Sequence, residues 1–290
     1  MNHRMKKLVS LLFAFCTLAG ASMAHAQLRL TITSGVTDPI PIAVVPFARA
    51  VPADGGLDVA SVIQKDLEST GRFKAMARGD MITTPTSVAA VDAAAWKQMR
   101  NDYVVVGRLV TQADGRVKIE ADLVNALTGV HVDNPNFTAQ PDNLRNAAHR
   151  VADALYEKIL GIKGAFATKI AYVSVDGRPP TQKYELYVAD ADGANRKRIG
   201  SSTLPLMSPA WSPDGEWLSY VSFERRTSAV FVQEVRTGKK ILVSARAGIN
   251  GAPTYSRDGK KLALTLSGSN GNLDVYLLDL GTQQDRKSVV

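Results

Sequence analysis

The chain has 290 residues, enough for two domains, and 45% of them are hydrophobic, as in an ordinary globular protein with an ample core. The formal charge of +8 comes from lysines and arginines scattered between apolar segments. This distribution argues against a nucleic-acid-binding protein, which gathers its basic residues in one stripe. The chain holds a single cysteine, so no disulfide framework is possible within it.

Residues 1–26 have the pattern of a secretory signal peptide. Basic residues precede an apolar run over residues 8–19, and the small residues Ala24 and Ala26 mark the cleavage site. The apolar run is shorter than the roughly 20 residues that a membrane-spanning helix needs. We therefore expect Gln27 to begin an exported mature protein, with an uncleaved anchor as the less favoured alternative.

The mature chain is expected to open with a half-buried strand, because apolar and polar residues alternate strictly there. The segment consists of Gln27, Leu28, Arg29, Leu30, Thr31, Ile32 and Thr33. A strand at an extreme terminus either pairs within its own domain or is offered to a partner as an added strand. The alternation alone leaves both open.

Residues 27–163 are predicted to form an α/β domain. The apolar run 42–45 indicates a buried strand, and a helix with one apolar face is expected at about 57–68, where Gly71 stops it. A second helix is expected near 93–99.

The second half of this domain pairs two strands and ends in a long helix. Strands are predicted at 103–110 and 117–125, joined by a turn at Ala113-Asp114-Gly115. The helix opens at Pro141-Asp142, has apolar residues at helical spacing and ends at Gly161.

After Gly164 the helical pattern gives way to short strands that repeat every 44 residues. The sequence S-P-A-W-S-P-D-G at 208–215 returns as A-P-T-Y-S-R-D-G at 252–259, and a weaker copy starts near Ile170. A period of this length with four strands per unit is typical of a propeller blade. Residues 164–290 are therefore predicted to be an all-β propeller segment. The repeated boxes contain Trp211, Ser212, Pro213, Asp214, Gly215 and Tyr255, Ser256, Asp258, Gly259.

Each box is predicted to form the hairpin turn between the first two strands of a blade. Glycine takes the positive-φ position of such a turn while aspartate caps it. Trp211 and Tyr255 are expected to pack between neighbouring blades.

The propeller segment is too short for a closed propeller. It holds fewer than three units of 44 residues, whereas closed propellers have about 4–8 blades. About three blades in an open arc would expose sheet faces. The last six residues, 285–290, are a poor strand, and we interpret them as translated sequencing-adapter sequence.

The signal peptide, the segment 28–36, the α/β domain and the repeated W-S-P-D-G box, in this order, resemble the TolB family of the Tol-Pal system. The resemblance implies a six-bladed propeller and a monomeric, non-enzymatic scaffold in the periplasm that links TolA to Pal. It implies roles in outer-membrane integrity, cell division and the cell cycle, and colicin and protein import. TolA would bind the segment Gln27 to Thr33 by strand addition, and Pal would bind the propeller.

Motifs for catalysis or metal binding are missing from the sequence, so neither an enzyme nor a cofactor is expected. His131 and His149 are interpreted as surface or packing residues. The stretch from Asp190 to Gly193 begins like a calcium loop but lacks the later ligands, and a blade hairpin turn explains it better. No nucleic acid is expected as a partner, and contact with membranes is expected only through other proteins.

Two alternative functions remain: a secreted serine peptidase whose catalytic domain is missing, and a propeller that binds a ligand in its channel.

Overall fold

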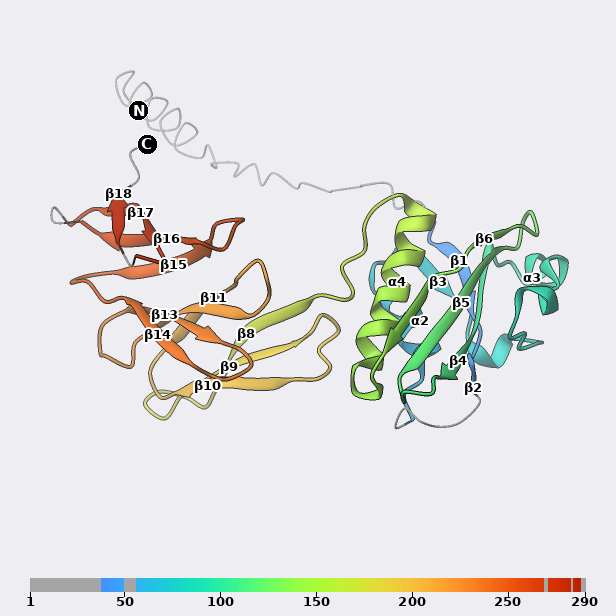
Figure 1. The fold of residues 1–290 in the computed structure, drawn as a ribbon, viewed down its shortest axis with the longest axis horizontal. Coiled ribbons are helices and arrows are strands. Elements are labelled where there is room, and N and C mark those ends of the chain that lie inside the picture. The colour runs from blue at the N-terminus through green and yellow to red at the C-terminus, as the bar shows by residue number, and fades with distance from the viewer. Residues whose placement is uncertain (1–37, 50–55, 269–270, 283, 288–290) are drawn as a thin grey trace, which may run out of the picture. The chain divides into compact units, whose positions relative to one another are not determined.

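The computed structural model describes residues 38–49, 56–268, 271–282 and 284–287 (Figure 1). The predicted signal peptide with Ala24 and Ala26, and the segment Gln27 to Thr33, lie outside the described residues. An α/β domain is followed in the chain by three antiparallel sheets, which confirms the predicted fold class. In the part of the chain that the structure describes, no helix is long and apolar enough to cross a membrane.

A mixed sheet of seven strands forms the centre of the N-terminal domain, in the order β3-β1-β4-β5-β6, with β2 beside β4 and β7 beside β5. β1 runs parallel to β3 and β4, whereas β4 and β5 form an antiparallel pair. The three predicted strands correspond to β1, β4 and β5. The others are too short to show a period in the sequence. The strands are β1 (Ile40–Val44), β2 (Ala48–Arg49), β3 (Phe73–Ala75), β4 (Tyr103–Thr111), β5 (Val117–Asn125), β6 (His131–Asp133) and β7 (Asn136–Ala139).

Three α-helices and three short 3₁₀ helices join these strands. The first helix begins two residues later than predicted, because the carboxylate of Asp58 accepts a hydrogen bond from the backbone N–H of Ser61 (2.9 Å) and so caps it. Leu57 therefore precedes the helix, although it still packs against the core. The helices are α2 (Val59–Ser69), α3 (Ala93–Gln98), α4 (Leu144–Leu160), η1 (Arg78–Asp80), η2 (Val88–Ala90) and η3 (Pro141–Asn143).

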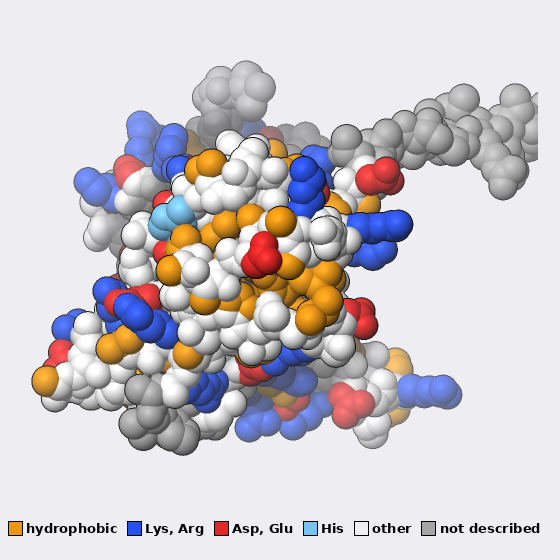
Figure 2. Space-filling view, turned by 90° about the vertical axis from the view of Figure 1, so that its right-hand side faces the viewer, with side chains coloured by type: hydrophobic (Ala, Val, Ile, Leu, Met, Phe, Trp, Pro, Cys, Tyr) orange, Lys and Arg blue, Asp and Glu red, His pale blue; other side chains and the backbone are white. Residues whose placement is uncertain are grey.

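The central sheet buries apolar side chains on both faces, because successive residues of a strand point to opposite sides. Ile42 and Val44 pack with α2 and α4, while Ala43 packs with the fully buried Trp96 of α3. The side of the molecule that faces the viewer in Figure 2 shows apolar side chains gathered near its middle.

The propeller segment forms three sheets, one of three strands and two of four. Each four-stranded sheet is a meander of sequential antiparallel strands, as the 44-residue repeat predicts. The first sheet comprises β8 (Lys169–Asp176), β9 (Lys183–Asp190) and β10 (Lys197–Ser202). The second comprises β11 (Leu206–Trp211), β12 (Trp217–Ser222), β13 (Ala229–Glu234) and β14 (Lys240–Ser244). The third comprises β15 (Asn250–Tyr255), β16 (Lys261–Ser267), β17 (Leu273–Asp279) and β18 (Asp285–Lys287).

Neighbouring sheets pack face to face through apolar side chains. Leu186 of the first sheet belongs to one core with Tyr220 and Phe231 of the second. Val230 of the second sheet belongs to another core with Leu264 of the third. Each sheet therefore depends on its neighbour for burial, as propeller blades do.

Asp285–Lys287 form a strand although their sequence lacks an apolar pattern, and the adapter interpretation of residues 285–290 stays a prediction. These residues form β18 and pair with β17. The Nζ of Lys287 also lies 2.7 Å from a carboxylate oxygen of Asp274 on β17. A main-chain ladder and a cross-strand ion pair thus replace the apolar side chains that a sequence pattern would show.

The connection between α4 and β8 is fixed to the helix. The carboxylate of Asp153 accepts hydrogen bonds from the backbone N–H groups of Phe166 (2.7 Å) and Ala167 (3.1 Å). A Cβ at Gly164 would lie 2.7 Å from the Cα of Asp153, so only glycine fits there. The ring of Phe166 meets that of Tyr156 edge-on at 5.6 Å.

Candidate functional site

The first repeated box is a hairpin turn closed by a serine and an aspartate. The Ser212 hydroxyl accepts from the backbone N–H of Trp217 (2.9 Å) and donates to Asp214 (2.5 Å). Asp214 also accepts from the backbone N–H of Glu216 (2.9 Å). The Ser212 hydroxyl, followed by the Glu216 amide, lowers the pKa of the Asp214 carboxyl. Gly215 has φ of 72°, as predicted for this turn.

The second box repeats this network. The Ser256 hydroxyl accepts from the backbone N–H of Lys261 (3.0 Å) and donates to Asp258 (2.6 Å). Gly259 has φ of 71°. The predicted roles of the aspartate and glycine are confirmed. The role of the serine was missed, although its recurrence two residues before each aspartate was the available signal.

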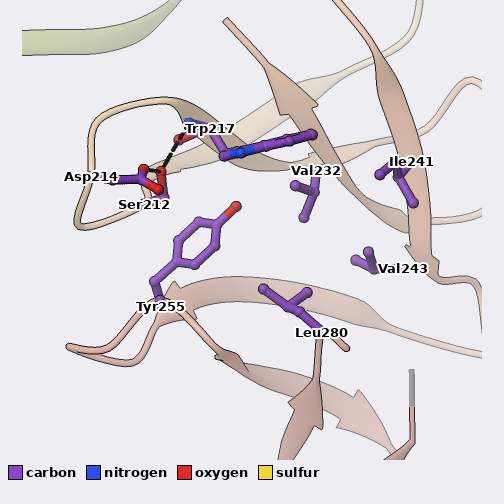
Figure 3. Close-up of a pocket in the computed structure, with 9 residues that line it drawn as sticks. Ser212, Asp214, Trp217, Val232, Ile241, Val243, Tyr255 and Leu280 are labelled. Atoms are coloured by element: carbon purple, nitrogen blue, oxygen red, sulfur yellow. Dashed lines mark hydrogen bonds between the residues drawn. The ribbon is translucent and has the colours of Figure 1, made fainter. Parts of the chain in front are cut away.

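The two boxes lie against each other. A Cβ on Gly259 would be 3.5 Å from the Cδ of Pro213. Tyr255 projects from the third sheet into the gap beside Ser212 and Trp217 of the second sheet, as Figure 3 shows. The predicted packing of Tyr255 between blades is therefore confirmed. The equivalent position of Trp211 between the first two sheets stays a prediction.

A cavity of about 230 Å³ remains in this gap. Its walls are mainly apolar, from Trp217, Val232, Ile241, Val243 and Leu280. Burial raises the pKa of the Tyr255 hydroxyl, which has no hydrogen-bond partner among the described residues. The polar groups at the rim, Ser212 and Asp214, are engaged in the turn. The cavity is therefore best explained as a packing seam between blades.

Acyl-transfer chemistry needs a base beside the serine hydroxyl. The histidines in the described part of the chain are His131 on β6 and His149 on α4, both in the N-terminal domain. His131 lies 2.9 Å from Asp122, and its side chain is 39% exposed. Neither histidine therefore activates Ser212.

His149 is a packing residue, in agreement with the sequence, but it lies between two acids. Its side chain is 1% exposed, and Asp66 and Asp192 have carboxylates close to its ring. Asp66 occupies the Nδ1 side, and Arg145 already donates to Asp192, so the geometry is that of an ion-pair network rather than a metal-binding site.

Asp192 lies in the β9–β10 turn, where the Gly193 backbone N–H donates to the Asp190 carbonyl (2.9 Å). The stretch that resembles a calcium loop is thus the predicted hairpin turn.

An α/β domain followed by packed antiparallel sheets with Ser-x-Asp-Gly hairpins defines a propeller protein with an N-terminal accessory domain. Residues 28–132 match the family model of the TolB amino-terminal domain, and residues 156–289 match that of the TolB beta propeller domain. The chain belongs to the TolB family.

Individual relatives agree with this assignment. The chain is 42% identical to the Tol-Pal system protein TolB of Methylococcus capsulatus, over 82% of this chain and 56% of the relative. It is 40% identical to the Tol-Pal system protein TolB of Xanthomonas oryzae pv. oryzae, over 86% of this chain and 57% of the relative. The crystal structure of TolB from Acinetobacter baumannii superposes with a TM-score of 0.76 at 33% identity, covering 87% of this chain and 60% of that one. The chain thus spans a little more than half the length of these relatives.

Proposed function

We propose that this chain acts as a non-enzymatic scaffold of the Tol-Pal system in the periplasm, where it links TolA and Pal. Through this link it would support outer-membrane integrity, constriction at cell division and the import of proteins such as colicins. The observation that carries the proposal is the match to both TolB domains in their family order. The signal-peptide pattern of residues 1–26 supports export to the periplasm.

The described side chains support a binding role rather than catalysis. The conspicuous polar groups of the propeller segment, the Ser212–Asp214 and Ser256–Asp258 pairs, are used to close hairpins. Deep burial of apolar side chains between sheets makes the segment a rigid platform. Such a platform suits protein contacts made by the loops at its ends.

We assign the TolA contact to the segment Gln27 to Thr33. Its alternating residues suit strand addition, in which main-chain hydrogen bonds give affinity and alternate side chains give register. The direct test is a pull-down with the C-terminal domain of TolA, comparing the mature chain with a variant that lacks residues 27–34. Binding that disappears with the deletion supports the scaffold function. Equal binding by the two proteins would contradict this assignment.

A single substitution tests the strand-addition mode. Ile32→Pro removes one backbone donor and one apolar contact, each contributing about 1 kcal/mol, so TolA affinity should fall about tenfold or more. Isothermal titration calorimetry gives the affinity, and the melting temperature should stay the same. Ile32→Val is the matched control, because it keeps the donor and most of the side chain. Unchanged affinity of the proline variant would exclude pairing at this position.

Pal is proposed to bind the propeller segment. A pull-down with soluble Pal lacking its lipid anchor tests this contact separately from TolA.

The coding sequence downstream of residue 290 distinguishes the scaffold from a secreted peptidase. Further W-S-P-D-G boxes followed by a stop codon support the scaffold, whereas a G-x-S-x-G motif after the last blade would support the peptidase.

A further inference from the structure

His149 is the one buried histidine in the described part of the chain, and the scaffold function does not use it. It lies on α4, with Nδ1 2.6 Å from a carboxylate oxygen of Asp66 on α2. Its Nε2 lies 3.7 Å from a carboxylate oxygen of Asp192 in the β9–β10 turn. Within the described residues this Nε2 has no hydrogen-bond partner. One imidazole ring thus stands between two helices of the N-terminal domain and the first sheet.

Charged side chains surround the His149 ring, from α2, from the β9–β10 turn and from α4 itself. Asp66 faces it from α2, Asp192 faces it from the turn, and Arg145 and Asp153 lie on α4 itself. Arg145 donates to Asp192 from Nε (3.1 Å) and Nη2. Two carboxylates and one guanidinium therefore surround the imidazole, which favours a positive charge on it.

The two ring nitrogens face one carboxylate each. A neutral imidazole donates from only one nitrogen, while the other carries a lone pair. If Nδ1–H donates to Asp66, the lone pair of a neutral ring points at the Asp192 carboxylate and is repelled by it. The protonated ring presents an N–H to both acids.

Burial alone favours the neutral ring, but the hydrogen bond and charge of Asp66, with the charge of Asp192, outweigh it and raise the pKa of His149. Burial raises the pKa of the Asp66 carboxyl. Burial also opposes ionisation of Asp192, but the hydrogen bonds from Arg145 and the Ala194 amide lower the pKa of that carboxyl. The raised pKa widens the pH range over which the ring is a charged imidazolium between two carboxylates.

We propose that protonation of His149 fastens the β9–β10 turn of the first sheet to α4, which makes this contact a pH-dependent latch between the N-terminal domain and the propeller segment. The Asp153-bound connection and the Arg145–Asp192 pair hold the same junction through contacts that do not involve the His149 ring. Loss of the proton thus loosens the junction without breaking the chain's other contacts there.

The direction of the pH effect follows from the raised pKa of the histidine. A group with a raised folded-state pKa contributes stability that is complete below its unfolded value of about 6.5. That contribution is lost as the pH rises through the folded value. On the acidic side, the latch weakens again when Asp66 takes up a proton.

The first test follows the ring nitrogens of His149 by ¹⁵N NMR through a pH titration of the chain without the predicted signal peptide. Asp192→Asn removes the negative charge at Nε2 and should shift the midpoint downward. Arg145→Met removes a positive charge and should shift it upward, which makes it the matched control. A midpoint that is the same in all three proteins would overturn the proposal. A zinc-dependent change of the ring signals at pH 8 would also overturn it, in favour of a cation site.

The second test measures the junction itself. Residues 27–290 contain no cysteine, so spin labels can be placed at Lys158→Cys on α4 and Lys239→Cys in the β13–β14 turn, both exposed positions. Double electron–electron resonance should give a narrow distance distribution below the His149 midpoint and a broader one above it. In Asp192→Asn the distribution should be broad at both pH values. A parent distribution of constant width would refute the latch.

Discussion

The N-terminal domain and the propeller segment bury their sheets in different ways. In the N-terminal domain, α2 and α4 cover one face of the sheet and α3 lies against the other. In the propeller segment each sheet is covered by the next, so the first and third sheets each have a face without a neighbouring sheet in the described residues. The N-terminal domain supplies its own cover, whereas the blades require one another.

The two outer faces also differ in chemistry. On the first sheet, Tyr172 stacks on Tyr187 with ring centroids 5.6 Å apart, and Arg196 lies 3.6 Å from the centre of the Tyr187 ring. Lys183, together with Tyr187 and Arg198, lowers the pKa of Glu185 to about 2. These charged and hydroxyl-bearing side chains allow the outer face of the first sheet to be exposed to water.

On the third sheet, the middle of the outer face carries apolar side chains, with the charged pair Lys261 and Asp279 at one end. Val275 pairs with Thr265, and Leu277 pairs with Ala263, so these four side chains share the side opposite the buried Leu264. Val275 is 47% exposed. An exposed apolar strip of this kind is an expected site of association.

The largest expected effect comes from removing a core side chain in either region. Leu155→Ala in α4 and Leu264→Ala in β16 should each cost about 2–5 kcal/mol of unfolding free energy, because both leucines are fully buried. Amide hydrogen exchange should then show which region each substitution loosens. Leu155→Ala is expected to loosen the N-terminal domain alone, whereas Leu264→Ala should loosen both the second and third sheets. Equal loosening of all regions by either variant would contradict the comparison.

A smaller effect distinguishes the two box hairpins. Ser212 is 5% exposed, so Ser212→Ala leaves the backbone N–H of Trp217 without its partner and should cost about 1–3 kcal/mol. Ser256 is less buried, and water can replace its hydroxyl, so Ser256→Ala should cost less. Urea unfolding of the two variants shows which substitution lowers the unfolding free energy more. The reverse order would mean that burial does not decide the strength of this network.

The smallest effect on stability is expected on the outer faces. Val275→Lys should change the unfolding free energy by no more than about 0.5 kcal/mol, because the side chain is half exposed, but it should reduce self-association. Sedimentation velocity at increasing concentration measures this. Ile170→Lys on the first sheet is the control, since that face is already polar. If the two variants behaved alike, the difference between the faces would have no consequence in solution.

The fold could be predicted wherever residues repeat with a period. Alternation and helical spacing located β1, β4, β5 and α4, and the 44-residue repeat located the blades. The short strand β18 was missed because main-chain pairing and the Lys287–Asp274 pair leave no apolar pattern. The partners of His149 could not be predicted, since Asp66 and Asp192 are far from it in the sequence and only tertiary packing joins them.

Gly164 bears on how the two regions could be separated or exchanged. The chain passes close to Asp153 there, and the Asp153 carboxylate accepts two backbone hydrogen bonds from the residues that follow. The connection is therefore packed against α4 and is not a flexible linker. A chimera that joins a different propeller to this domain should therefore keep the native sequence through Thr168 and place the junction at the start of β8.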